Sequence, residues 1–211
     1  MDVQEIAPRL WWWSAPHPEW TPAADKDGKG WGQIVSSYAL VADDAFVVFD
    51  PLIPEGEEDT FWKAMDRDVE HHGPPAILVT IHWHVRSSQQ ILDRYEGSTL
   101  WAHKPAARRV GNRTRYTNTF VQGDELPGGV EALPMHHMDE AAYWLPSHAS
   151  TVIGDTILGH DGRARLLPAS WLRKVESYDE VRRSVQRVLK FPATRLLLTH
   201  GGPTDANALD V

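Results

Sequence analysis

Hydrophobic and polar positions divide the chain into short strands and a few amphipathic helices. The apolar run Ala76–Val79 follows a Gly-Pro-Pro turn at 73–75 and precedes a polar segment, which is typical of a strand buried on both faces. Apolar residues recur every three or four positions in Glu57–His71 and in Val181–Leu189, which predicts two helices. Further strands are predicted at Ile6–Ser14, Ile34–Leu40, Ala45–Phe49, Thr99–Ala102, Glu131–Met135, Ala141–Leu145, Thr151–Ile153 and Arg195–Thr199.

Two shorter helices are predicted at Ser87–Tyr95 and Pro105–Val110. A capping-box pattern from Ser177 to Glu180 precedes the last helix. The segment Ala15–Gly32 is rich in proline, glycine and charge, which predicts a loop. Its two tryptophans, Trp20 and Trp31, either pack on the body of the protein or fold over a pocket. Strands and helices mixed in this way indicate the α/β class, and we expect residues 1–211 to form one domain.

The composition excludes several classes of partner. The 211 residues carry a net charge of −8, which argues against a nucleic-acid backbone or an anionic membrane and leaves a small-molecule substrate. Cysteine is absent, so a metal ion must be held by histidines and carboxylates. The first residues do not have the basic and then apolar order of a signal peptide, and no apolar run has the length of a membrane span. We therefore expect a cytoplasmic protein. The sequence carries no signal for an oligomeric state.

Two histidines follow the buried strand directly. Side chains at positions i and i+2 of an extended segment leave the same face, so His82 and His84 would point the same way at a strand end. This is how a protein presents two nitrogen ligands to one metal ion. The same spacing also fits two surface histidines in a polar loop.

Four segments in order resemble the motifs of the metallo-β-lactamase superfamily, over about Ile34 to Pro203. The HxHxDH motif of that family matches residues 82–87, and its third-histidine segment matches residues 136–140. Its Gly-Asp pair matches residues 154–155, and its last histidine matches His200. The resemblance implies an αββα sandwich that holds metal ions at its edge. Counting back from Pro146 favours His136 as the third ligand, with His137 as the alternative.

The chain departs from the family where Asp and His are expected, because it has Arg86 and Ser87 there. By the resemblance, the first metal site keeps its ligands His82, His84 and His136. The second site keeps Asp155 and His200 but lacks two ligands. A permanent cation at Arg86 would repel a second metal ion. Arg86 could instead hold Asp155 by a salt bridge or bind a carboxylate or phosphate of the substrate.

The chemistry implied is that of one metal ion per chain, held by three imidazoles and by Asp155 as a fourth ligand. Zn²⁺ suits these ligands, with iron or manganese as alternatives. Such an ion lowers the pKa of bound water and makes hydroxide available for hydrolysis of an ester, lactone, amide, thioester or phosphoester. Asp155, Asp139 or Glu140 could orient the water, and His200 could donate to the leaving group.

Tryptophans suggest a pocket for an apolar or aromatic substrate, with Trp12, Trp83 and Trp144 as candidates, although tryptophans also fill cores. The leading prediction is therefore a metallo-hydrolase. The competing prediction is a non-catalytic binding or scaffold protein that kept the fold, which Arg86-Ser87 favours and the retained Asp155 and His200 oppose. A third alternative is binding of an anionic ligand through Arg86 without a metal.

Overall fold

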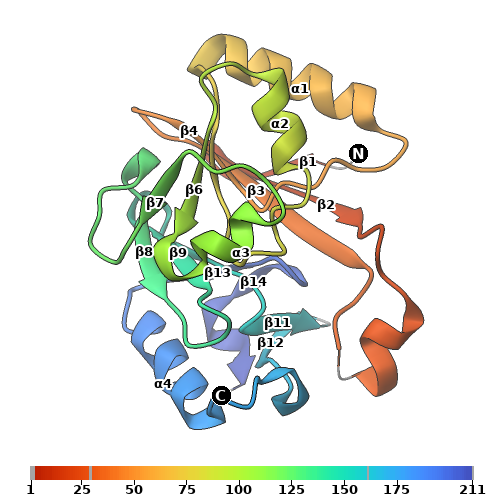
Figure 1. Ribbon diagram of the computed structural model, residues 1–211, viewed down its shortest axis with the longest axis vertical. Coiled ribbons are helices and arrows are strands. Elements are labelled where there is room, and N and C mark those ends of the chain that lie inside the picture. Colours follow the sequence, from red (N-terminus) through yellow and green to blue (C-terminus); the bar gives the residue numbers. More distant parts are fainter. Residues whose placement is uncertain (1–2, 29, 161, 211) are drawn as a thin grey trace.

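The protein is built of four layers, helix–sheet–sheet–helix, in a computed structural model that describes residues 3–28, 30–160 and 162–210 (Figure 1). Helices α1 and α2 cover the outer face of the first sheet, and α4 covers the outer face of the second. The predicted αββα sandwich is thus confirmed. The α-helices of the described residues are α1 (Glu58–His72), α2 (Ser88–Arg94), α3 (Ala107–Gly111) and α4 (Tyr178–Val188).

The first sheet has the order β1-β2-β3-β4-β5-β6-β7. Its strands are β1 (Val3–Ala7), β2 (Leu10–Pro16), β3 (Ile34–Val41), β4 (Phe46–Phe49), β5 (Ala76–Leu78), β6 (Thr99–His103) and β7 (Asn118–Phe120). Neighbours pair antiparallel up to β4 and parallel from β4 to β7. Because the carboxyl ends of parallel strands meet at one edge, the segments after β4 and β5 lie together there.

The second sheet has the order β14-β13-β10-β9-β8, and a small third sheet has the order β11-β12-β15. Their strands are β8 (Glu131–Pro134), β9 (Ala141–Leu145), β10 (Ser150–Ile153), β11 (Ile157–His160), β12 (Arg163–Leu166), β13 (Arg195–Leu198), β14 (Gly202–Asp205) and β15 (Leu209–Asp210). Strands β10 and β13 pair parallel, so the residues that follow them are also neighbours.

Short 3₁₀ turns complete the connections, at η1 (Pro22–Gly28), η2 (Lys104–Ala106), η3 (Pro127–Gly129), η4 (Pro146–His148), η5 (Ala169–Trp171) and η6 (Ala206–Ala208). The first of them belongs to the predicted loop 15–32, which projects beside β11 and β12 (Figure 1). None of the helices that the structure describes is both long and apolar enough to cross a membrane.

Apolar side chains fill the spaces between the layers. Phe61 and Met65 of α1 pack on the outer face of the first sheet, and Val185 and Val188 of α4 pack on that of the second. Between the sheets, two tyrosines link one layer to the other through buried hydrogen bonds. The Tyr38 hydroxyl donates to Leu198 O at 2.7 Å, and the Tyr143 hydroxyl donates to Val79 O at 2.8 Å.

Most predicted elements are confirmed within one or two residues, but the predicted strand Ile6–Ser14 is confirmed only from Leu10 onward, as β2. The chain turns at residues 8 and 9, where Arg9 has a φ of 64°, and β1 pairs back on β2 as a hairpin. Strands β7, β11, β12, β14 and β15 were not predicted. Helix α4 begins as predicted, although the Ser177 side chain makes no capping hydrogen bond.

The link between the sheets gives a test of stability. Replacing Tyr143→Phe removes a buried hydroxyl and leaves Val79 O without that donor, so we expect the free energy of unfolding to fall by about 1–2 kcal/mol. Urea unfolding followed by circular dichroism measures the change. Tyr116→Phe, at a side chain that is 40% exposed, is the control and should leave the midpoint unchanged.

Candidate metal centre

Three buried side chains converge at the edge of the sandwich where β5, β10 and β13 end. His84 Nε2 lies 3.1 Å from Asp155 Oδ1, and His200 Nε2 lies 3.0 Å from the same oxygen. These three atoms all lie within 4.8 Å of one another, and His84, Asp155 and His200 are the group of potential metal ligands that the described residues form. We call this group the His-Asp-His cluster.

A fourth buried residue, Asp50, orients His84 from behind. Asp50 directly follows β4, and its carboxylate accepts hydrogen bonds from Thr80 N at 2.7 Å and from the Thr80 hydroxyl at 2.5 Å. His84 Nδ1 lies 2.9 Å from Asp50 Oδ2, so the other ring nitrogen is directed at Asp155. In the sequence, Asp50 marks only the end of a strand. The available signal for a role in the site was that Asp50 directly follows a buried strand, β4, which pairs with β5, the strand that precedes His84.

The electrostatics of the cluster follow from these contacts. Burial and Arg86 oppose protonation of His84, but the carboxylates of Asp155 and Asp50 outweigh them and raise its pKa. Burial would raise the pKa of Asp155, but His84 and His200 outweigh it and hold that pKa well below its usual range. Burial lowers the pKa of His200 to about 4 despite the nearby Asp155. The cluster therefore offers a carboxylate and a neutral imidazole to a cation at neutral pH.

Trp83 and Glu140 hold Asp155 in place. The Trp83 indole Nε1 donates to Asp155 Oδ2 at 2.5 Å, so both carboxylate oxygens have partners. Glu140 was predicted as a residue that could orient water, but its buried carboxyl group accepts from the backbone N–H groups on both sides of Asp155, at residues 154 and 156. Burial and the charge of Asp155 raise the pKa of Glu140 to about 8. Glu140 thus shapes the loop that carries Asp155.

The structure groups His84 with Asp155 and His200 rather than with His82 and His136. His82 is buried against the Trp83 ring, at 4.2 Å between centroids, and its Nδ1 has no hydrogen-bond partner among the described residues. Burial, with Arg109 and Arg113, lowers the pKa of His82 to about 4. It lies outside the cluster, so the three-histidine site stays a prediction.

The two neighbouring histidines after β8 differ in their surroundings. His136 is partly exposed, and its Nε2 lies 3.0 Å from Glu180 Oε2 of α4. His137 is almost fully buried, with Nδ1 3.1 Å from Glu176 Oε2 and its ring 6.5 Å from that of Trp83. Of the two, His137 lies beside Trp83, the residue that donates to Asp155, whereas His136 pairs with α4.

Arg86 does not pair with Asp155 in the structure. Its backbone has a φ of 37°, and its Nη1 donates to the carbonyl oxygens of Ser36 at 2.8 Å and Asp50 at 3.0 Å. The Nε and Nη2 atoms are buried and have no partner among the described residues. Burial lowers the pKa of Arg86, although Asp50 and Asp155 oppose this. Asp139, the other predicted water-orienting residue, is ion-paired with Arg109.

A cavity of about 270 Å³ opens onto the cluster, lined by His17, Glu19, Trp31, Trp83, His84, Arg113, Asp155, Trp171 and His200. The Trp31 ring lies 4.9 Å from the His200 ring, and Arg165 donates to Gly30 O at 3.0 Å, which ties the loop 15–32 to β12. Trp31 therefore folds over the pocket, one of the two alternatives for this loop.

Two predicted pocket tryptophans lie elsewhere. The prediction that Trp144 binds substrate is wrong, because Trp144 is buried in the core beneath α4 against Phe191, at 5.7 Å between ring centroids. Trp12 donates from its Nε1 to the Ser36 hydroxyl at 2.9 Å and does not line the cavity. Trp83 does line it.

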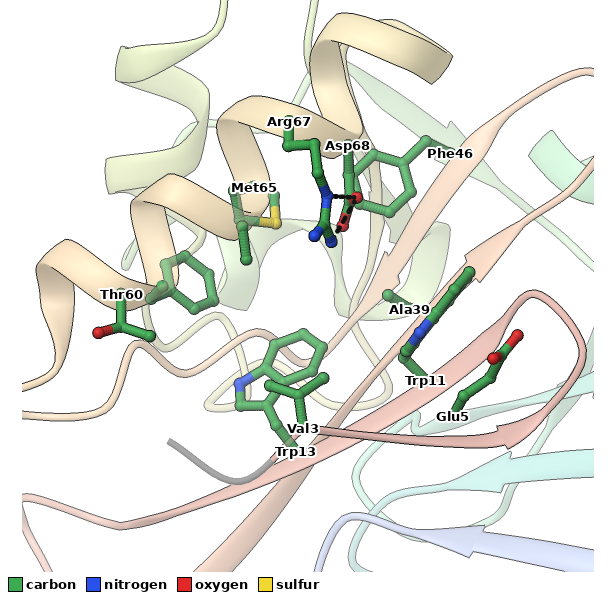
Figure 2. Close-up of a pocket in the computed structure, with 12 residues that line it drawn as sticks. Val3, Glu5, Trp11, Trp13, Ala39, Phe46, Thr60, Met65, Arg67 and Asp68 are labelled. Carbon is green, nitrogen blue, oxygen red and sulfur yellow. Dashed lines mark hydrogen bonds and ion pairs between the residues drawn. The ribbon is translucent and has the colours of Figure 1, made fainter.

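A second, more apolar cavity, of about 420 Å³, lies between α1 and strands β1 to β4 (Figure 2). Its wall includes Trp11, Trp13, Phe46 and Met65, and its charged residues include Arg67 and Asp68, which pair with each other at 3.1 Å. None of its lining residues belongs to the His-Asp-His cluster.

A glycine pair brings the third sheet against the turn that carries His200. Gly159 N donates to His200 O at 2.6 Å. A Cβ on Gly201, which has a φ of 116°, would lie 2.4 Å from Gly159 Cα, and a Cβ on Gly159 would lie 3.0 Å from Gly201 Cα. This close approach of two backbones leaves no room for a side chain at Gly201, and a side chain at Gly159 would require the facing backbone to shift by a few tenths of an ångström.

No protein-family model matches the sequence, and no curated protein sequence matches it. Solved structures do match. The metallo-β-lactamase FIM-1 from Pseudomonas aeruginosa in its mono-zinc form has a TM-score of 0.69 and 11% identity, over 98% of this chain and 90% of that one. A metallo-β-lactamase from Pontibacter korlensis has a TM-score of 0.69 and 12% identity, over 98% and 94%. A metallo-β-lactamase family protein from Thermus thermophilus has a TM-score of 0.65 and 15% identity, over 95% and 76%. The chain therefore has the metallo-β-lactamase fold.

The segment that holds His137 gives a prediction of pH dependence. Glu176 is buried, which would raise its pKa, but hydrogen bonds from Met138 N and from the backbone and side chain of Arg173 outweigh burial and lower the pKa to about 2. A carboxyl whose pKa is lowered on folding stabilises the protein above its unfolded pKa of about 4.3, and this contribution is lost as the pH falls toward about 2.

We therefore expect Glu176→Gln to be about 2 kcal/mol less stable than the unmodified chain at pH 7, and the difference to shrink between pH 5 and pH 3. Urea unfolding across this range measures it. Glu131→Gln, at an exposed side chain, is the control. A difference that stays constant with pH would contradict the assignment of an ionised Glu176.

Proposed function

We propose that this chain, with its metallo-β-lactamase fold, is a metal-dependent hydrolase that uses a single ion held by His84, Asp155 and His200. The observation that supports the proposal is the convergence of the His-Asp-His cluster in a cavity. In a tetrahedral site with bonds of about 2.0–2.1 Å, ligand atoms are separated by roughly 3.3 Å. The nitrogen–oxygen distances of 3.0 and 3.1 Å in the cluster are close to that value, so the donor set fits a metal ion.

The contacts behind the cluster also fit this use. A histidine that ligates a metal ion commonly donates its other N–H to a carboxylate, which fixes the tautomer and the ring orientation. Asp50 stands in that position at His84 Nδ1, and Thr80 in turn holds Asp50. Two nitrogens and one oxygen suit Zn²⁺, with iron or manganese as alternatives.

The proposed ligand set differs from the three-histidine site that the resemblance implied. It joins His84, which that site shares, to the two residues that remain of the second site. His82 and His137 are not ligands in this set, and their rings lie beside that of Trp83. With the guanidinium of Arg86 buried next to Asp50, a second metal ion is disfavoured, and Arg86 supplies positive charge in its place.

When bound, the ion supplies Lewis acidity and lowers the pKa of a bound water, which provides a nucleophile at neutral pH. Asp155, held at both oxygens, fixes the ligand geometry. His200 would bind the ion through Nε2, which is directed at the cluster, while its Nδ1 is buried on the far side of the ring and has no partner among the described residues. Esters, lactones, amides, thioesters and phosphoesters are the substrate classes to screen.

The second candidate is a non-catalytic binding protein, and one observation favours it. Both oxygens of Asp155 already have protein donors, namely His84, His200 and Trp83, so the network is satisfied by the protein alone. Metal content separates the two candidates more directly than an activity screen does.

Metal content of untagged protein, measured by elemental analysis, should give about one ion per chain. We expect His200→Ala to lose it, because one of three ligands is removed, and His136→Ala to keep it, because His136 pairs with Glu180 instead. Loss in His136→Ala with retention in His200→Ala would restore the three-histidine site. An unmodified protein that neither contains nor takes up metal would favour the binding protein.

Trp83→Phe removes the hydrogen bond to Asp155 Oδ2 and keeps an aromatic ring in the cavity wall. Groups that orient a ligand carboxylate contribute about 10–100-fold to metal affinity, so we expect zinc affinity to fall by that amount. Competition with a chromophoric chelator measures it. Trp62→Phe, on α1 and outside the cavity, is the matched control and should bind zinc like the unmodified chain.

A further inference from the structure

Two neighbouring cavities join into one trough at the candidate metal centre. The first, of about 270 Å³, contains the His-Asp-His cluster. The other, of about 410 Å³, is distinct from the cavity of Figure 2 and has Arg86 in its wall. They share His17, Glu19, Trp83 and Arg113 as lining residues. The trough therefore runs from the cluster past Trp83 to Arg86, and Arg113 borders both halves.

Two arginines line the trough, and neither is paired with a carboxylate of the described residues. Arg113 is exposed and its side chain makes no hydrogen bond or ion pair with the described residues, while the buried Nε and Nη2 of Arg86 also have no partner among them. A buried guanidinium is ordinarily paired with a carboxylate, since burial of an unpaired charge is costly. Outside the cluster, Glu19 is the carboxylate in the wall of the trough, and it is exposed.

The nearest buried carboxylates are already engaged. Asp50 accepts from Thr80 and His84, and Asp155 is held by the two cluster histidines and Trp83. Neither carboxylate accepts a hydrogen bond from Arg86, whose acceptors are two backbone carbonyl groups. An anion that enters the trough from solvent would give the exposed Arg113 a partner, and the buried charge of Arg86 would attract it without direct contact.

Aromatic rings form the rest of the wall beside the cluster, at Trp31, Trp83 and Trp171. Trp31 is held in place, because its carbonyl accepts from Trp20 Nε1 at 2.9 Å and its ring packs edge-on against His200 at 4.9 Å. Flat, rigid rings at this position favour a planar apolar group, through stacking and edge contacts.

We propose that the trough selects a planar aromatic substrate that carries an oxyanion, a carboxylate or a phosphate, with Arg113 as the specificity residue. Arg113 holds the oxyanion at the mouth, Arg86 adds positive charge beneath it, and the aromatic part lies along Trp83 with its scissile bond toward the cluster. The inference rests on the proposed hydrolase function only in that the bound molecule is its substrate.

Isothermal titration calorimetry with three probes of one shape tests the proposal by binding affinity: 2-naphthoate, the non-hydrolysable 2-naphthylphosphonate and the uncharged 2-naphthamide. We expect at least one of the two anions to bind at least tenfold more tightly than the amide, since charge-assisted hydrogen bonds are about twice as strong as neutral ones. The better anion identifies the oxyanion as carboxylate or phosphate.

Arg113→Gln should weaken binding of the preferred anion about tenfold and leave the amide unchanged within twofold. Arg108→Gln is the matched control, because Arg108 is exposed on α3 nearby in the sequence and lines neither cavity. Thermal melting shows whether both variants are folded. Equal affinity for anions and amide, or an Arg113→Gln variant that binds the anion normally, would overturn the proposal.

The result is independent of the proposed function. A chain that contains no metal and hydrolyses nothing can still show the charge preference, which would support an anion-binding trough in a non-catalytic protein. A chain that contains metal and is an active hydrolase but does not distinguish naphthoate or naphthylphosphonate from naphthamide would keep the proposed function and lose this inference.

Discussion

The buried carboxylate of Asp50 is the contact on which the candidate metal centre depends. It joins the end of β4 to the turn after β5 by accepting two hydrogen bonds from Thr80, and it fixes the ring of His84. The backbone carbonyl of the same residue accepts from Arg86 and from the Ser37 hydroxyl. One residue thus sets the direction of a metal ligand and the position of the cation beside it. Neither the orientation of His84 nor the position of Arg86 could be read from the spacing of His82 and His84 in the sequence.

Buried acidic side chains serve the other loops of the site in a similar way. Glu140 accepts from the backbone on both sides of Asp155, and Glu176 accepts from the backbone N–H that follows His137. Loop backbone has no strand or helix partner for its N–H groups, so acceptors must come from side chains. The loops at this edge are therefore shaped by acidic residues that do not themselves border the cavity.

The regular part of the fold was accessible from the sequence because helices and buried strands have clear apolar periods. The hairpin of β1 and β2 was missed because the apolar residues from Ile6 to Trp13 hide the turn at Pro8 and Arg9. The small third sheet was missed because its strands are short and polar in part.

The individual members of the candidate site were accessible as well, since each follows a strand. Their grouping was not, because sequence order does not show which way two adjacent histidines face, and only the packing of His137 beneath Glu176 separates it from His136. The contact of Trp83 with Asp155 spans 72 positions and leaves no local signal. Composition alone likewise could not distinguish Trp83, in the cavity wall, from Trp144, in the core.

The contact between Gly159 and Gly201 has an evolutionary consequence. The Gly159 backbone and its own φ of 116° both favour glycine at position 201, the facing backbone of residues 200 and 201 favours glycine at position 159, and neither glycine lines the cavity beside the cluster. A substitution at Gly201 would displace the turn that carries His200 or the strand that faces it, and one at Gly159 would push the same turn by a few tenths of an ångström. A mutational survey would therefore find two sensitive sites that resemble binding residues, although what they preserve is the spacing between two chain segments.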